Sequence, residues 1–126
     1  MTKLFTLVLV VATAAFFGLS ATGLAAGNQD RERIRTGNCS GATDWKLKTK
    51  AEDNGVEVEF EVDQNRNGRR WRVVLRRNGS VVFNGILRTR PPSGSFEVNR
   101  IVPSGRITAT ARALATGETC RASIAA

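Results

Sequence analysis

Residues 56–62, VEVEFEV, alternate strictly between apolar and acidic side chains. Successive side chains of a β-strand point to opposite faces, so this pattern predicts a strand with one buried and one solvated face. Similar short runs continue along the chain: TDWKLKTKA, RWRVVLRR, SVVFNGILR, SFEVNRIV, RITATARALA and ETCRASI. No segment after residue 27 keeps a 3.6-residue apolar repeat over three turns, and we therefore expect no helical core.

Turn-forming residues separate these runs. Asn54-Gly55, Asn67-Gly68 and Asn78-Gly79 tolerate positive φ, and Pro91-Pro92 presets a turn. We count seven strands, or eight if RIRTGNC is included. Strands of this length and spacing predict an all-β, antiparallel sandwich of the immunoglobulin-like or fibronectin-like kind. Asn84-Gly85 interrupts one run, which predicts a β-bulge there and leaves open which side chains of residues 81–88 face inward.

The first 26 residues have the pattern of a signal peptide. A basic start is followed by a long apolar run and then by small residues, so we expect cleavage near Ala25 or Ala26. The alternative is an uncleaved anchor, although the strongly apolar part, residues 4–19, falls short of the ~20 residues that span a bilayer. We therefore expect a secreted, extracellular protein with no membrane span after processing. Residues 27–38 would form a short polar segment and residues 39–126 the sandwich domain.

Two cysteines are present, Cys39 and Cys120. In an oxidising compartment the simplest interpretation is one disulfide that closes almost the whole domain. Two free thiols or an intermolecular bridge are the alternatives. The spacing matches neither a C-x-x-C redox pair nor a zinc-binding set.

Three stretches, GRRWRVVLRRNGSVVFNG, GSFEV and ITATARALATGETCRASI, resemble a group of small exported actinobacterial proteins with an immunoglobulin-like or fibronectin-like sandwich. The resemblance covers most of residues 39–125. It implies the fold but no activity, ligand or functional residue. The chain contains no tyrosine, so the tyrosine corner of true immunoglobulin domains is missing.

Arginines crowd the stretch that follows VEVEFEV. Pairing residues 56–62 with residues 70–77 in a hairpin would align apolar side chains with one another. That register would also set Glu61 against Arg72 and Glu57 against Arg76. We therefore expect the glutamates and the arginines to neutralise one another on one solvated sheet face.

The basic excess remains after this pairing. The chain has a net charge of +8, and removal of Lys3 with the signal peptide would leave 18 basic and 11 acidic residues. An envelope of this sign attracts anionic partners, and guanidinium groups suit phosphate, sulfate and carboxylate. The expected anion-binding residues are those left unpaired around the hairpin, Arg66, Arg69, Arg70 and Arg77. Specific nucleic-acid binding is not expected, because most aromatic residues of the mature chain fall at inward positions.

Several function classes are disfavoured. The chain contains no histidine, which removes the Ser-His and Cys-His nucleophilic systems and the commonest metal ligand. We expect no enzyme, no catalytic residue, no cofactor and no metal site. DQNRNG resembles the start of a calcium loop through Asp63, Asn65 and Asn67, but the twelfth position is Val74 where a glutamate is required.

The sequence predicts a secreted binding module, favoured as a monomer. Its partner would be an anionic cell-wall polymer or an extracellular protein. The alternative is a stand-alone structural or protease-inhibitor-like domain, in which RTRPPSGS forms a projecting loop. Residues 88–95 are read more simply as a proline-fixed crossover between two sheets.

Overall fold

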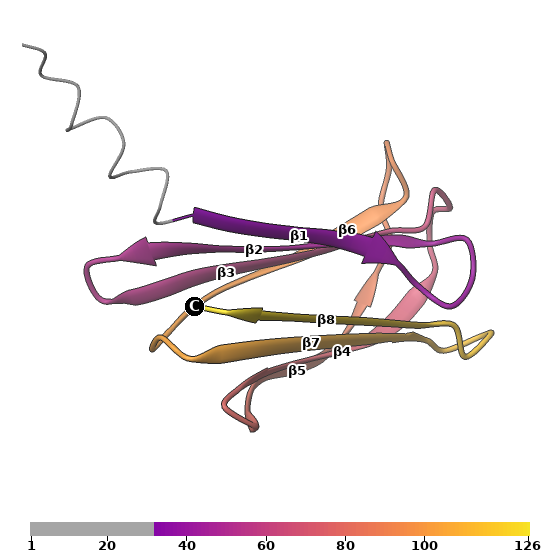
Figure 1. Cartoon of the computed structure of the whole chain (residues 1–126). Coiled ribbons are helices and arrows are strands. Elements are labelled where there is room, and N and C mark those ends of the chain that lie inside the picture. Colours follow the sequence, from indigo (N-terminus) through magenta and orange to yellow (C-terminus); the bar gives the residue numbers. More distant parts are fainter. Residues whose placement is uncertain (1–31) are drawn as a thin grey trace, which may run out of the picture.

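The computed structural model describes residues 32–126, and these residues form two four-stranded antiparallel sheets packed face to face (Figure 1). The signal peptide and the cleavage site expected from the sequence fall outside the described residues. In sheet A the strand order is β1 (Glu32–Asn38), β2 (Asp44–Glu52), β3 (Gly55–Asp63) and β6 (Ser95–Val102). In sheet B the order is β5 (Ser80–Arg88), β4 (Arg70–Arg77), β7 (Arg106–Ala113) and β8 (Thr119–Ala125). The all-β sandwich predicted from the sequence is confirmed, with eight strands.

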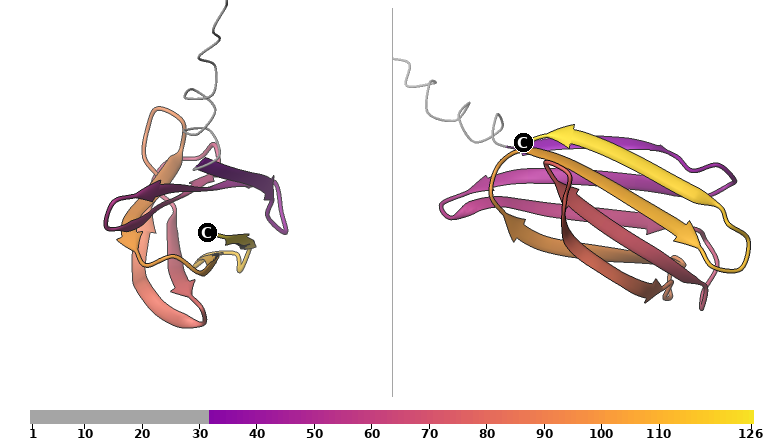
Figure 2. Two further views of the ribbon diagram at one scale, coloured as in Figure 1. Left: turned by 60° about the vertical axis from the view of Figure 1, so that its left-hand side comes forward. Right: turned by 90° about the horizontal axis from the view of Figure 1, so that it is seen from below.

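The core lies between the two sheets and follows the alternation of the sequence. Along β3 the four apolar side chains are buried, and the glutamates between them point outward. Along β4 every second residue from Trp71 to Leu75 is fully buried. The rings of Trp71 and Phe96 bridge the sheets with centroids 6.3 Å apart. Figure 2 (left) shows the two layers almost end-on.

The expected hairpin between residues 56–62 and 70–77 is wrong. β3 pairs with β2 and β6 in sheet A, whereas β4 pairs with β5 and β7 in sheet B. Residues 64–69 therefore cross from one sheet to the other. Alternation specifies which side chains of a strand face the core, but it is equally satisfied when two such strands face each other across that core.

A second crossover joins β5 of sheet B to β6 of sheet A, as predicted for residues 88–95. Its tip projects from the sandwich in Figure 1. The backbone N–H of Gln64 donates to the Gly94 carbonyl at 3.0 Å, which ties the base of this loop to the other crossover. Gly94 has φ +69°, and a Cβ there would collide with the Arg66 backbone, so both conformation and close packing require glycine.

β1 is the eighth strand. The sequence places residues 32–38 in a short polar segment and leaves open an eighth strand at RIRTGNC; these residues do form a strand, which pairs with Asp44–Lys50 of β2. None of its side chains is buried, so the apolar alternation that marks the other strands is missing here. Arg33 and Arg35 lie on the same side of the sheet as Thr49 and Leu47. Charges directed inward at an edge strand discourage pairing with another chain.

The β-bulge in β5 does not lie at Asn84-Gly85. Leu75 pairs with Phe83 and Arg76 with Val81, so the register shifts at Val82. Phe83, Gly85 and Leu87 therefore face the core side, which settles the orientation that the sequence left open. The Phe83 ring covers Gly85, where an added Cβ would lie 3.0 Å from the ring.

The predicted disulfide between Cys39 and Cys120 is present, with an S–S distance of 1.98 Å. It joins the chain just after β1 to β8, and so connects the two sheets at one edge. Backbone and side-chain hydrogen bonds between Ser40 and Thr119 lie beside it. Among residues 32–126 there is no helix with the length and apolar character needed to cross a bilayer.

Candidate anion-binding face

The structure brings together three of the four arginines predicted from the sequence. Arg66, Arg69 and Arg70 line an open hollow of about 520 Å³, here called the end cleft, between the 64–69 crossover and the loops at 40–43 and 114–118. Arg77 ends β4 and lies far along the strand from them. Its guanidinium donates to the Ser104 carbonyl from Nε at 3.0 Å and Nη2 at 2.7 Å. Arg77 is therefore engaged with a loop and does not join the other three.

Thr89 holds the crossover that carries these arginines. Its buried hydroxyl accepts a hydrogen bond from the Arg69 N–H at 2.9 Å and donates to the Arg66 carbonyl at 2.6 Å. The Gly68 N–H donates in turn to the Thr89 carbonyl at 2.8 Å. The backbone of the crossover is thus fixed, while the side chains of Arg66, Arg69 and Arg70 are exposed.

Glu118 is the only acidic residue among those that line the end cleft. Its Oε2 accepts hydrogen bonds from the N–H groups of Gly41 and Thr43, each at 3.0 Å, and its Oε1 accepts one from the Thr43 hydroxyl at 2.9 Å. The carboxylate therefore fastens the β1–β2 loop to the start of β8. It forms no ion pair with the arginines of the cleft.

The acidic ladder of β3 is neutralised by lysines and not by the arginines of β4. Glu57, Glu59 and Glu61 lie directly opposite Lys50, Lys48 and Lys46 of β2. The Nζ of Lys48 lies 3.0 Å from Oε2 of Glu59. This hydrogen-bonded ion pair raises the pKa of Lys48 and lowers the pKa of Glu59. The expected Glu61–Arg72 and Glu57–Arg76 pairs do not exist, because their strands belong to different sheets.

Glu97 of β6 stands beside this ladder without a cation of its own. Glu97 lies at the surface, but partial desolvation of its carboxyl group, and then repulsion from the Glu59 carboxylate, raise the pKa of Glu97. A raised carboxyl pKa means that the folded state holds its proton more tightly than the unfolded chain does. The contribution of Glu97 to stability is therefore present at low pH and is lost as the pH rises through its folded pKa. The lowered pKa of Glu59 has the opposite effect, lost as the pH falls.

Replacement of Glu97 by glutamine is therefore expected to stabilise the domain at pH 7 by about 0.5 kcal/mol, because exposed like charges repel only weakly. At pH 4 the variant and the wild type should be equal within error. Urea unfolding at the two pH values measures the difference. Glu57→Gln, which removes a carboxylate opposite Lys50, serves as the control and should not stabilise. An equal gain for Glu97→Gln at both pH values would contradict the explanation.

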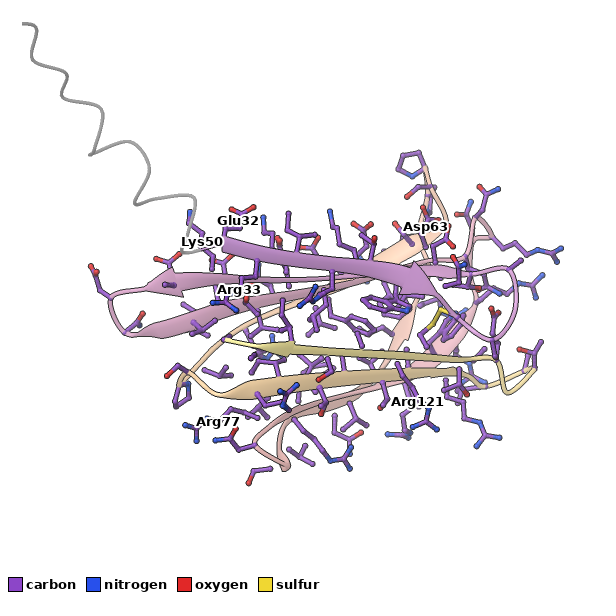
Figure 3. All side chains as sticks on the ribbon, in the orientation of Figure 1. Glu32, Arg33, Lys50, Asp63, Arg77 and Arg121 are labelled. Atoms are coloured by element: carbon purple, nitrogen blue, oxygen red, sulfur yellow. A yellow bond between two sulfur atoms is a disulfide. The ribbon has the colours of Figure 1, made fainter. Side chains whose placement is uncertain are left out.

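Sheet B presents a face with one sign of charge. Among residues 32–126, the four strands of sheet B contain no acidic residue, whereas those of sheet A contain six basic and eight acidic residues. The strands of sheet B carry eight arginines: Arg70, Arg72, Arg76, Arg77, Arg88, Arg106, Arg112 and Arg121. All except Arg77 share the outward side, and we call this outer side of sheet B the arginine face. Figure 2 (right) looks onto sheet B, and Figure 3 shows Arg121 pointing away from sheet A.

The register places like charges together on this face. Arg72 of β4 lies directly opposite Arg112 of β7. Arg72 donates to the Asn84 side-chain oxygen at 3.0 Å, and Arg106 donates to the Ser123 hydroxyl at 3.0 Å. Within the described part of the chain no arginine of this face has an ion-pair partner. Like charges directly opposite each other destabilise a sheet, so this arrangement weakens the fold unless an anion lies between them.

An open groove of about 660 Å³ runs over this face, with arginine guanidinium groups from three strands around it. The four arginines of its lining are Arg72, Arg76, Arg112 and Arg121, and Thr110 and Thr119 add hydroxyl groups. Leu114 lines both the groove and the end cleft, so the two hollows adjoin. Arg66, Arg69 and Arg70 therefore continue the positive surface of the groove toward the loop end of the domain.

The sequence interpretation missed the central residues of this face. It assigned Arg72 and Arg76 to glutamate partners, and it left Arg112 and Arg121 unassigned to any site. Alternation in RITATARA does place Arg112 outward, and alternation in TCRASI does the same for Arg121. The pairing of β7 with β4 and β8 brings them together, and that pairing is a tertiary feature.

The calcium-like stretch forms a turn. The Asp63 carboxylate accepts a hydrogen bond from the N–H of Asn65 at 3.1 Å, and Asn65 has φ 59°. Asparagine tolerates this left-handed conformation. In residues 32–126 no group of three or more histidine, cysteine, aspartate or glutamate side chains is placed to hold a metal ion.

Comparison with known proteins gives no family assignment. No family model matches the chain, and no curated protein or solved structure matches it significantly. The resemblance to small exported actinobacterial proteins therefore stays an expectation. The geometry and charge of sheet B are therefore the features from which a function can be inferred.

Proposed function

We propose that this protein is a secreted, non-enzymatic binding module whose arginine face engages an anionic polymer of the cell envelope. The observation that carries the proposal is the separation of charge between the sheets. The strands of sheet B contain arginine and no acid among the described residues, while the strands of sheet A contain both signs in nearly equal number.

Arginine is well suited to this role. Its planar guanidinium donates two parallel hydrogen bonds to a phosphate, sulfate or carboxylate group and remains charged at any pH that the cell meets. A surface of one sign also attracts a polyanion over a distance of about one Debye length, ~8–10 Å at physiological salt. Binding then releases counterions from the polymer and weakens steeply as salt is added.

The apolar groups of the domain support a polymer over a nucleic acid or a protein partner. Trp71, Phe60 and Phe96 are buried in the core, and Arg100 covers the Phe83 ring with its Cζ 4.6 Å from the ring centroid. Within the described chain, the arginine face thus has no exposed aromatic ring. Stacking of single-stranded bases needs such rings, and protein interfaces are usually centred on aromatic anchors.

A matched pair of triple variants tests the proposal. Arg72→Gln, Arg112→Gln and Arg121→Gln together should lower affinity for a long polyphosphate by about 100-fold near 0.1 M salt, and should reduce the salt slope by about 2 to 3. Lys46→Gln, Lys48→Gln and Lys50→Gln remove the same charge from the outer face of sheet A and should leave binding nearly unchanged. Fluorescence anisotropy or calorimetry over a salt series measures both.

Equal losses in the two triple variants would show that net charge alone drives binding, and would refute the proposal. A single-stranded oligodeoxynucleotide that binds more tightly than a polyphosphate of equal charge would refute the choice of a plain polyanion. Circular dichroism of both variants checks that the sandwich is retained.

A second candidate function is an inhibitory domain that presents the tip of the 88–95 crossover. Pro91, Pro92 and Ser93 are exposed, and the base of the loop is held by the Arg90–Ser95 bridge and by the contact of Gly94 with Arg66. A partner held by this tip would bind independently of salt. Retention of an extracellular protein in 0.5–1 M salt, abolished by Pro91→Ala with Pro92→Ala, would support this alternative.

A further inference from the structure

Within the proposed function, on which this inference rests, we infer that the ligand is a linear polyanion that lies diagonally across all four strands of sheet B. Each strand of the sheet contributes one outward arginine to a line that crosses it. The four residues, here called the diagonal track, are Arg88 of β5, Arg72 of β4, Arg112 of β7 and Arg121 of β8.

The strand register defines this line. Arg88 pairs with Arg70, which lies two residues before Arg72, so Arg88 is a diagonal neighbour of Arg72. Arg72 lies directly opposite Arg112. Arg112 pairs with Thr119, and Arg121 lies two residues further along β8, again on the diagonal. The track therefore steps in one direction across the sheet.

General sheet geometry gives the length of the track. Directly opposite residues are about 5 Å apart and diagonal neighbours about 7–8 Å, so the four Cα atoms span roughly 20 Å. Long guanidinium side chains can close or widen these steps by several ångströms. A row of arginines with these steps suits a chain that bears an anionic group on each successive unit. The whole length of the track exceeds the reach of one phosphate or sulfate ion.

The surroundings of the track favour such a chain. The groove contains Arg72, Arg112 and Arg121 of the track, and the Thr110 hydroxyl beside them can donate to a ligand oxygen, whereas the Thr119 hydroxyl donates to the Gly117 carbonyl at 3.1 Å. Arg88, at the other end, makes one long hydrogen bond of 3.3 Å from Nη1 to the Gly68 carbonyl. Four guanidinium groups that are aligned and without acidic partners would bind successive charges of one polymer together, which multiplies their individually weak affinities.

Arg76 and Arg106 provide matched controls. They lie on the same face but off the track. Arg76 is four residues along β4 from Arg72 and pairs with Thr108, and Arg106 pairs with Ala125 near the opposite end of β7. Removal of Arg76 and Arg106 changes the net charge of the face as much as removal of Arg88 and Arg121. Only the removal of Arg88 and Arg121 shortens the track.

The experiment measures affinity for polyphosphates of two, four, eight and about fifty units at one ionic strength by titration calorimetry. Affinity per chain should rise at least tenfold between the shortest ligand and the length that spans about 20 Å, and beyond that length only slowly. Arg88→Gln with Arg121→Gln should abolish this rise, because only two adjacent arginines of the track then remain. Arg76→Gln with Arg106→Gln should preserve the rise.

The outcomes separate this inference from the proposed function. Long polyphosphate that binds to the arginine face but is weakened equally by both double variants would overturn the diagonal track and leave the binding module standing. Pyrophosphate that binds as tightly as the long chain would also overturn the track, because a single anion would then suffice. No binding of any polyphosphate or sulfated polysaccharide at low salt would overturn the proposed function and the track together.

Discussion

Replacement of Cys39 and Cys120 by alanine should lower the free energy of unfolding by about 2–5 kcal/mol. The bond closes a loop with a sequence separation of 81 residues, so its loss frees most of the chain in the unfolded state. It also connects the edge of sheet A to the edge of sheet B. Since small domains have a net stability of about 5–15 kcal/mol, the expected loss is a large fraction of the whole.

Urea unfolding of the double variant and of wild-type protein, with and without reductant, measures this loss. The reduced wild type and the double variant should unfold at the same urea concentration, well below that of the oxidised wild type. A double variant within 0.5 kcal/mol of oxidised wild type would show that the two packed sheets alone supply the stability. Thiol titration of the oxidised protein after denaturation should find no free sulfhydryl.

Replacement of Trp71 by alanine is expected to cost about 3–5 kcal/mol, the largest effect expected of a single substitution here. Trp71 is fully buried near the start of β4, packs near Phe96 of the facing sheet, and lies between Leu87 and Ala113 of the neighbouring strands. Its indole N–H donates to the Gln64 side-chain oxygen at 3.0 Å, at the start of the 64–69 crossover. The residue thus joins the core to the loop that carries Arg66 and Arg69.

Trp71→Phe separates the two contributions. It keeps most of the ring volume and removes the indole donor, so we expect a cost of about 1–2 kcal/mol. Thermal or urea unfolding of both variants measures the difference. A phenylalanine variant as unstable as the alanine variant would mean that the bond to Gln64, and not the packing, dominates.

The strands and their inward residues could be predicted because the pattern that marks them lies within each strand's own sequence. Val56, Val58 and Phe60 recur with period two, and turn residues end each run. β1 was harder to predict, because an edge strand with no buried side chain has no apolar pattern to detect. The sequence predicted the β-bulge at Asn84-Gly85, but the register shifts at Val82. The Phe83 ring covers Gly85, and a glycine covered in this way is compatible with a regular strand.

The pairing of the strands could not be read in the same way. VEVEFEV fits a β4 neighbour and a β2 neighbour equally well, because both present apolar residues to the core and cations to solvent. The short crossover at 64–69 resembles a hairpin turn in composition, yet Thr89 and Gly94 from a distant segment fix it across the two sheets. The incorrect strand pairing affected the candidate site, because it assigned Arg72 and Arg76 to glutamates that belong to the other sheet.

The observed strand pairing changes which charged residues neutralise one another. Lysines neutralise the glutamates on sheet A, as in the 3.0 Å Lys48–Glu59 pair, and this leaves the arginines of sheet B without acidic partners among the described residues. Arg72 opposite Arg112 is unfavourable for folding alone. Local features that oppose stability tend to mark functional sites. The arginine face is such a feature, spread over four strands.

The most direct measurement is a titration of ¹⁵N-labelled protein with a polyphosphate of about eight units, followed by amide chemical shifts. We expect shifts that concentrate on the four strands of sheet B, at Arg72, Arg88, Arg112 and Arg121, and that vanish in high salt. Glu57 and Glu59 on the opposite sheet should stay unchanged. Shifts centred on sheet A, or on the Pro91-Pro92 tip alone, would contradict the assignment of the binding face to sheet B.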